Sequence, residues 1–205
     1  MKLYLTSYQL GSEPKKLVAL VGPNKKVAVI CNAIDGLNTA DRDERLRREI
    51  TAMTNLGFLP EELDLRDYFG KPGELEKQLN TYGLLWIRGG NVFILRKAMA
   101  LSGFDKIIRN VLDKNIVYAG YSAAVCVAGP SLHGLELCDE EKLVPKGYPA
   151  KTEWDGLNLI AYVIAPHYQS DHPESTMIND VVAYFKEKTI PYKTLRDGQT
   201  IIVNN

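Results

Sequence analysis

Cysteine, histidine and tryptophan are scarce in this chain, which has three, three and two of them among its 205 residues. Cys31, Cys126 and Cys138 are odd in number and lack a Cys-x-x-Cys spacing, so we expect reduced thiols rather than a disulfide framework. The 25 Lys and Arg residues are matched by 25 Asp and Glu residues. A net charge of zero gives neither the basic footprint of a nucleic-acid-binding protein nor the acidic excess of a solvating tail.

Long apolar runs are also missing. No stretch approaches the roughly 20 apolar residues that span a bilayer, and the start of the chain has no signal-peptide core. The composition is that of a globular protein, with 45% hydrophobic and 24% charged residues. We therefore expect one domain over residues 1–205 in the cytoplasm, without a nucleic-acid or membrane partner, as a monomer or a homodimer.

Short runs of β-branched and apolar residues alternate with helical patterns. This alternation predicts an α/β fold, a three-layer sandwich whose mostly parallel central sheet has helices on both faces. Gly129–Glu153 is the least regular stretch, and Asp197-Gly198 predicts a hairpin turn near the end. The predicted strands are Lys2–Ser7, Lys26–Cys31, Glu62–Leu65, Leu84–Arg88, Ile116–Gly120, Leu159–Ala165 and a terminal hairpin of Tyr192–Leu195 with Thr200–Val203. The predicted helices are Asp41–Asn55, Asn91–Leu101, Phe104–Asp113 and Pro173–Lys188.

The segment Ile116–Val125 is the most informative for chemistry, because an apolar strand runs there into Gly120-Tyr121-Ser122-Ala123-Ala124. Such a strand-to-helix turn holds a nucleophile on a strained corner at the carboxyl edge of a sheet, and it needs small neighbours. Ser122 is therefore a candidate nucleophile. Short Gly-x-Ser-x-Ala matches are common, so a plain strand–helix junction with Ser122 as the N-cap is the alternative.

A second strand, Leu84–Arg88, ends in Gly89-Gly90-Asn91. Two glycines after a strand let backbone N–H groups face a pocket with no side chain in the way, as an oxyanion hole or an anion site requires. The alternative is a tight turn capped by Asn91. The segment is neither a Gly-x-Gly-x-x-Gly motif nor a P-loop, so a nucleotide site is disfavoured.

Among the three histidines, His167 directly follows a predicted buried strand, whereas His133 and His172 lie in polar, loop-like segments. Ligands of open α/β sheets bind at the carboxyl ends of the strands. A lone histidine there is more often structural than catalytic. Because Ser122 is predicted at the same edge, His167 becomes a candidate general base.

These pieces together resemble the peptidase E (dipeptidase E) family of serine peptidases, which shares its fold with class I glutamine amidotransferases. The resemblance covers almost the whole chain, and it depends on the order and spacing of all the pieces. They are Leu5-Thr6-Ser7, Arg88–Phe93, Gly120–Ala124, Asp155-Gly156-Leu157 and Pro166-His167-Tyr168.

The resemblance implies that Ser122 is the nucleophile, that His167 is the general base, and that the amides of Gly90 and Ala123 form the oxyanion hole. It also implies an acidic residue in the loop after the nucleophile helix, where Asp139 is the match and Glu136 and Glu140 stay possible. Gly89, Asn91, Arg88 and His172 are candidates for contacts with the substrate. The implied chemistry calls for no metal and no organic cofactor.

Two residues near the nucleophile bear on this reading. The family usually has glycine where this chain has Ala124, and a methyl group there is tolerated only if φ is negative. Cys126 competes for the role of nucleophile, since amidotransferases of this fold use cysteine. It lies about one helical turn beyond Ser122, so we expect it to face away from the corner as a core residue.

The predicted function is hydrolysis of short peptides through a Ser-His-Asp/Glu triad. A non-catalytic or amidotransferase-like binding domain is the alternative. In the family that the chain resembles, an arginine near the start of the helix after the histidine binds the side chain of an N-terminal aspartate in the substrate. The corresponding stretch here, 171–178, has no arginine or lysine, which predicts a peptidase without a strict N-terminal Asp preference.

Overall fold

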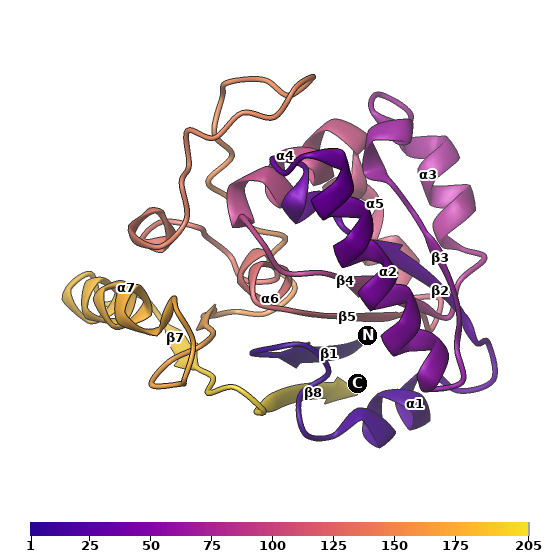
Figure 1. Ribbon diagram of the computed structural model, residues 1–205, viewed down its shortest axis with the longest axis horizontal. Coiled ribbons are helices and arrows are strands. Elements are labelled where there is room, and N and C mark those ends of the chain that lie inside the picture. The colour runs from indigo at the N-terminus through magenta and orange to yellow at the C-terminus, as the bar shows by residue number, and fades with distance from the viewer. Residues whose placement is uncertain (205) are drawn as a thin grey trace.

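The computed structural model describes residues 1–204 and has a six-stranded sheet at its centre (Figure 1). The strands are β1 (Lys2–Thr6), β2 (Lys26–Ile30), β3 (Leu59–Glu62), β4 (Leu84–Ile87), β5 (Val117–Tyr121) and β8 (Thr200–Asn204). Their order is β3-β2-β4-β5-β1-β8, and all neighbours are parallel except β8, which runs antiparallel to β1. The predicted mostly parallel sheet is confirmed.

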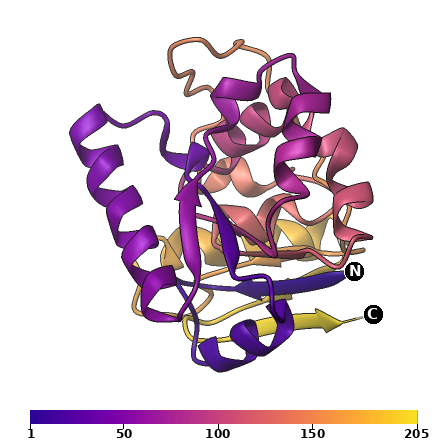
Figure 2. The ribbon, with the colours of Figure 1, turned by 90° about the vertical axis from the view of Figure 1, so that its right-hand side faces the viewer.

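Helices cover both faces of this sheet and complete the predicted three layers. The first face carries α1 (Pro14–Val21) and α2 (Thr39–Asn55). The second carries α3 (Pro72–Leu79), α4 (Val92–Ser102), α5 (Phe104–Leu112), α6 (Ala123–Val127) and α7 (Ser175–Glu187). Figure 2 shows α2 separated from the other helix layer by the sheet.

Alternation along the strands divides the interior into two cores. In β1, Leu3 and Leu5 pack with the α3–α7 layer, whereas Tyr4 packs with α1 and α2. Every residue of β4 and β5 is buried, because strands in the middle of such a sheet have helices on both sides. This explains why these two strands could be recognised in the sequence as continuous apolar runs.

The predicted C-terminal hairpin is wrong. β7 (Tyr192–Thr194) pairs in parallel with β6 (Val163–Ala165) in a separate two-stranded sheet, and β8 pairs with β1. Asp197 and Gly198 do form a turn, closed by a hydrogen bond from the Gln199 N–H to the Arg196 carbonyl (2.9 Å). The turn carries the chain from one sheet to the other.

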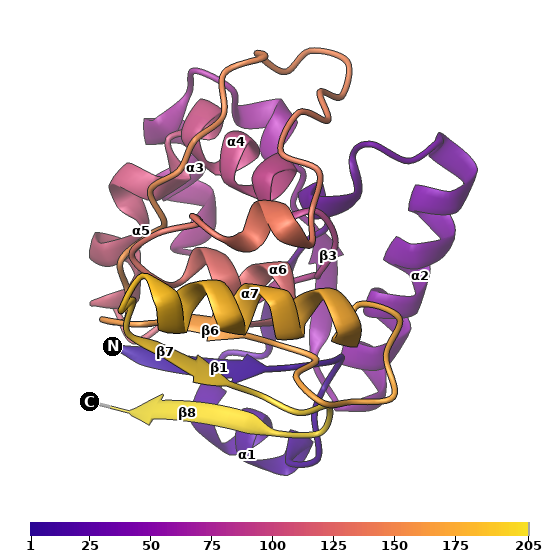
Figure 3. The same ribbon diagram turned by 90° about the vertical axis from the view of Figure 1, so that its left-hand side faces the viewer.

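Other boundaries also differ from the prediction. The third strand is Leu59–Glu62 rather than 62–65, and a 3₁₀ turn capped by Asp64 follows it. The sequence patterns did not reveal α1 and α3, two eight-residue helices that each begin with a proline. The irregular stretch Gly129–Glu153 contains one short 3₁₀ turn, and part of it arches away from the helices, while α7 lies across β6 and β7 (Figure 3).

The carboxyl ends of four strands meet at one edge of the molecule. Ser7 follows β1, Arg88 follows β4, Ser122 follows β5 and His167 follows shortly after β6. Because β7 is parallel to β6, the end of β7 also points to this edge. Within residues 1–204, no helix combines the length and the apolar character needed to cross a membrane.

Candidate active site

Ser122 occupies the sharp turn between β5 and α6. Its backbone has φ 52° and ψ −114°, a conformation that residues other than glycine rarely adopt. The Ser122 N–H donates a hydrogen bond to the Ser7 carbonyl at the end of β1 (3.2 Å). A Cβ at Gly120 would lie 2.3 Å from the Ile87 carbonyl oxygen, so the turn requires glycine there. The local geometry is that of a nucleophile elbow.

Ala124 and Cys126 both lie inside α6. Ala124 is not among the residues with positive φ, so its methyl group introduces no backbone strain. Cys126 is buried, its Sγ donates to the Ile164 carbonyl (3.4 Å), and burial raises the pKa of its thiol well above the ordinary value. A buried thiol of high pKa is unreactive, and the predicted core role of Cys126 is confirmed.

Gly89 and Gly90 bring bare backbone against the nucleophile. A Cβ at Gly89 would lie 2.7 Å from Ser122 Cβ, and one at Gly90 would lie 2.7 Å from the Ala33 carbonyl oxygen. Gly90 also has φ +143°, which disfavours other residues. Within residues 1–204, neither the Gly90 N–H nor the Ala123 N–H donates a hydrogen bond. Free N–H groups on both sides of a serine suit an oxyanion hole.

His167 is buried, with 1% of its surface exposed, and is fixed from two sides. Its Nδ1 is 2.7 Å from Asp197 Oδ1, and its backbone N–H donates to Ser7 Oγ (2.7 Å). Ser7 Oγ in turn donates to Asp197 Oδ1 (2.7 Å), and the Asp197 N–H donates to Ser170 Oγ (2.8 Å). The carboxylate is thereby oriented toward the imidazole. Because Nδ1 faces Asp197, Nε2 is left for chemistry.

Ser122 and His167 line one cavity of about 190 Å³, together with Tyr8, Arg45, Arg88, Gly89, Gly90, Tyr121, His172 and Glu174. In the described part of the chain, no hydrogen bond joins Ser122 Oγ to His167. Catalytic hydrogen bonds are often long before substrate binds. The two side chains therefore share the space in which a substrate carbonyl would be attacked.

Asp139 does not contact His167. Its Oδ2 accepts a hydrogen bond from the Val92 N–H (2.8 Å) at the start of α4. The two alternative acids also point elsewhere: Glu136 accepts from the Gly134 N–H (2.6 Å), and Glu140 is exposed. An unpaired helix N–H attracts a nearby carboxylate, which explains why Asp139 caps α4 instead of orienting the imidazole.

Asp197, and not Asp139, is therefore the acid that contacts His167, and the sequence reasoning missed it. The Asp-Gly pair was interpreted as a hairpin turn, and that interpretation hides the parallel pairing of β6 and β7. Residues that follow two neighbouring parallel strands lie side by side, and His167 and Asp197 do so. The signal that could have identified Asp197 is an acidic residue shortly after β7, the strand that pairs in parallel with the strand before His167.

Burial governs the acid–base behaviour of the site. It lowers the pKa of His167 below the ordinary value, although the hydrogen bond to Asp197 opposes this shift and the nearby His172 adds to it. Burial also raises the pKa of Asp139 to about 7, against the lowering effect of the Val92 hydrogen bond. His167 is therefore neutral, as a general base must be, at and above neutral pH.

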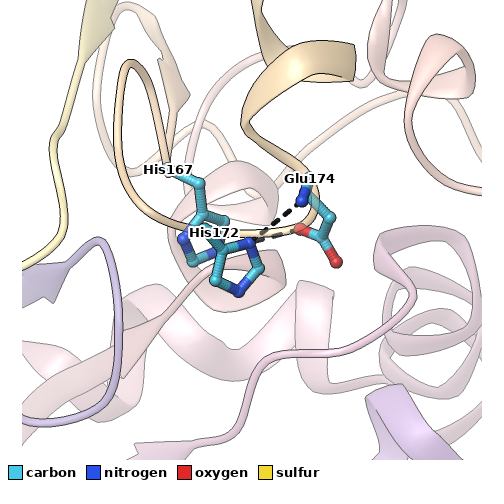
Figure 4. Close-up of side chains that lie close together, drawn as sticks. All are labelled: His167, His172 and Glu174. Carbon is cyan, nitrogen blue, oxygen red and sulfur yellow. Dashed lines mark hydrogen bonds and ion pairs between the residues drawn. The ribbon is translucent and has the colours of Figure 1, made fainter.

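His172 and Glu174 lie directly beside the imidazole of His167 (Figure 4). The rings of His167 and His172 stack with centroids 3.7 Å apart and planes at 8°. Glu174 Oε2 is 3.8 Å from His167 Nε2, and the Glu174 N–H donates to His172 Nδ1 (3.2 Å). The three side chains could offer metal ligands within 4.8 Å of one another. A metal must lie in the plane of each imidazole that binds it, so stacked parallel rings are unsuited to one ion.

Arg88 and Asn91 support the site rather than present free groups to it. Arg88 Nε is 3.3 Å from buried Glu49, which also accepts from Trp86 Nε1 (2.8 Å). Asn91 Oδ1 accepts from the N–H groups of residues 93 and 94, which caps α4 (3.0 Å each). By contrast Arg45 on α2, which the sequence reasoning did not single out, is exposed, lines the cavity, and has no ion pair in the described chain.

The chain matches the model of Peptidase family S51 over residues 12–205. It is 28% identical over 141 residues to an uncharacterized peptidase of Listeria monocytogenes, which covers 69% of this chain and 65% of that protein. It is 25% identical over 169 residues to a Peptidase E of Streptomyces coelicolor, which covers 80% of this chain and 64% of that protein. The chain therefore spans slightly less than two thirds of each of these relatives.

A solved structure has the same fold. A Listeria monocytogenes EGD-e protein, assigned provisionally to peptidase E, superposes with a TM-score of 0.74 at 23% identity, covering 100% of this chain and 98% of its own. The family match extends over nearly the whole chain and includes the elbow, the glycine pair and the His167 segment. The chain belongs to peptidase family S51, a family of peptidases.

Proposed function

We propose that this chain is a serine peptidase that hydrolyses dipeptides and other short peptides through Ser122, His167 and Asp197. The observation that carries the proposal is the strained Ser122, which shares a cavity with His167, whose Nδ1 is 2.7 Å from Asp197 Oδ1. Family membership and the dipeptidase and peptidase E names of relatives support the same substrate class.

In the proposed reaction, Ser122 Oγ attacks the scissile carbonyl and His167 Nε2 accepts its proton. Asp197 holds the imidazole in the tautomer whose Nε2 is free and stabilises the imidazolium that forms. The amides of Gly90 and Ala123 donate to the oxyanion. His167 then protonates the leaving amine, and a water molecule activated by the same imidazole hydrolyses the acyl-enzyme. His167 finally returns the proton taken from water to Ser122 Oγ, so each proton transfer in the cycle passes through His167.

The proposal includes no strict preference for an N-terminal aspartate. The beginning of α7 and the loop before it contain no arginine or lysine, and the cavity there contains the carboxylate of Glu174. A substrate carboxylate placed beside Glu174 would meet a like charge. Of the two arginines that line the cavity, Arg88 is already paired with Glu49, and Arg45 comes from α2 rather than from the segment before α7.

We also propose that residues 1–205 act as one catalytic unit in the cytoplasm. The thiols of Cys31, Cys126 and Cys138 are all unpaired, which suits a reducing compartment.

The test is a panel of dipeptides with leucine at the second position and Asp, Glu, Ala, Leu, Met, Gln or Lys at the first. Hydrolysis of at least one, lost in Ser122→Ala, supports the proposal. Inactivity of a folded sample toward the whole panel overturns it. Cleavage of Asp-Leu with kcat/KM roughly 100-fold above all the others would show that some cation reads aspartate, and would overturn the specificity alone.

A further inference from the structure

Two opposite charges in the active-site cavity have no fixed partner of their own. Within residues 1–204, the only ion-pairing partner of the Glu174 carboxylate is the His167 imidazole, which is neutral at and above neutral pH, and Arg45 makes no ion pair. The other charged groups nearby are engaged: Arg88 is paired with Glu49, and Asp139 caps α4. The cavity therefore offers a substrate one free carboxylate and one free guanidinium.

Glu174 lies where the amino terminus of a dipeptide must lie. In a dipeptide, only the Cα separates the α-ammonium nitrogen from the scissile carbonyl carbon, so the two atoms are about 2.5 Å apart. An acid that binds this ammonium must then stand a few ångströms from the nitrogen that serves the nucleophile. Glu174 Oε2 is 3.8 Å from His167 Nε2, which meets this requirement.

Arg45 approaches the same space from the opposite layer. It projects from α2, whereas Glu174 immediately precedes α7, and both line the cavity of about 190 Å³ and its neighbour of about 270 Å³. Two residues of extended peptide span about 7 Å, so a dipeptide bound at Glu174 ends within the same small space. A guanidinium is the side chain best suited to hold a carboxylate through two parallel hydrogen bonds.

We propose that Glu174 binds the α-ammonium and Arg45 binds the C-terminal carboxylate of the substrate, so that the site selects free dipeptides by both of their ends. This inference rests on the proposed function. Each group is a substrate-binding residue, and neither takes part in proton transfer at the scissile bond. Longer peptides lose the contact with Arg45, and N-terminally blocked peptides lose the contact with Glu174.

The experiment compares four forms of Leu-Leu: free, N-acetylated, C-amidated and blocked at both ends. The variants are Glu174→Gln and Arg45→Gln. The matched controls are Glu187→Gln at the far end of α7 and Arg48→Gln, one turn along α2, whose partner is Glu44. All rates are measured at pH 7, where His167 is neutral and the α-amino group of Leu-Leu, with an ordinary pKa of about 7.7–8.0, is still mostly protonated.

For the wild type and both controls we expect each block to lower kcat/KM by about 10- to 100-fold, the range of a charge-assisted hydrogen bond. Glu174→Gln should lose that factor on free Leu-Leu and change less than threefold on the N-acetylated form. Arg45→Gln should show the same pattern with the C-amidated form. Calorimetry of Leu-Leu binding to Ser122→Ala, with and without each second substitution, should give parallel losses of affinity.

Two outcomes overturn the inference. The first is that the wild type cleaves free and blocked forms equally well, or that a variant loses the same factor on the free form and on the form blocked at its end. Glu174 and Arg45 would then not bind the substrate's ends, whereas the proposed peptidase activity would be unaffected. If the wild type cleaves none of the four forms and a fluorophosphonate leaves Ser122 unlabelled, the proposed function fails, and this inference fails with it.

Discussion

Replacing Asp197 by asparagine tests the assignment of the triad acid. The carboxylate accepts from His167 Nδ1 at 2.7 Å and from Ser7 Oγ at 2.7 Å. Both of these bonds go to Oδ1. An asparagine keeps the size, but where its amide nitrogen takes the place of Oδ1 it donates an N–H to Nδ1 and so holds the imidazole in the wrong tautomer, with its proton on Nε2. The imidazolium of the transition state also loses the charged carboxylate that accepts its Nδ1–H hydrogen bond.

The expected loss in kcat is 10³- to 10⁴-fold, equivalent to about 4–5.5 kcal/mol of transition-state stabilisation. The assay is steady-state hydrolysis of the best dipeptide of the panel at pH 8, with circular dichroism to show that the variant is folded. Asp139→Asn is the matched comparison. Its amide oxygen can still accept from the Val92 N–H, so kcat should fall less than threefold. An Asp197→Asn enzyme within tenfold of the wild type, or an Asp139→Asn enzyme that loses 10³-fold, would refute the reasoning.

Three further predictions follow from the site. Because burial lowers the pKa of His167, the acid limb of the pH dependence of kcat/KM should have its midpoint below about 6.5, and a midpoint above 7 would contradict this assignment. Gly90→Ala should lower kcat at least roughly 100-fold, because Gly90 has φ +143° and an added Cβ would lie 2.7 Å from the Ala33 carbonyl oxygen. A rate within threefold of wild type would show that the Gly90 amide is not used. The pKa of Asp139, about 7 when folded, exceeds its unfolded value of about 3.9. The folded state therefore binds this proton more tightly, and its stability should fall as the pH rises from about 4 to about 7. In thermal unfolding, the Tm of Asp139→Asn should rise relative to that of the wild type between about pH 4 and about pH 7. A fall in its relative Tm over this range would contradict the prediction.

Most of the fold could be predicted from short-range patterns. The strands that became β4 and β5 are continuous apolar runs because helices bury both of their faces. Ser122 and the glycine pair could be recognised because a sharp turn and a close backbone approach restrict the residues allowed at a few consecutive positions. Such constraints are local, so they remain visible in one sequence.

The parts that could not be predicted depend on contacts between distant segments. Whether Asp197 joins a hairpin or the end of a parallel strand depends on which partner β7 finds, and a turn of Asp-Gly is compatible with both. Asp139 was chosen because the resemblance implied an acid in the loop after the nucleophile helix, yet its carboxylate accepts from the N–H of Val92 on another element. Arg45 lies on α2, and only the packing of that helix beside the sheet edge brings it to the cavity.

Covalent labelling tests the central claim that Ser122 is a nucleophile activated by His167. The folded chain is treated with a fluorophosphonate at pH 8, and the adduct is located by intact-mass and peptide mass spectrometry. We predict one adduct per chain on Ser122, absent in Ser122→Ala and formed at least roughly 100-fold more slowly in His167→Ala. A folded chain that forms no adduct, or a Ser122→Ala chain that is labelled as fast as the wild type, would contradict the account.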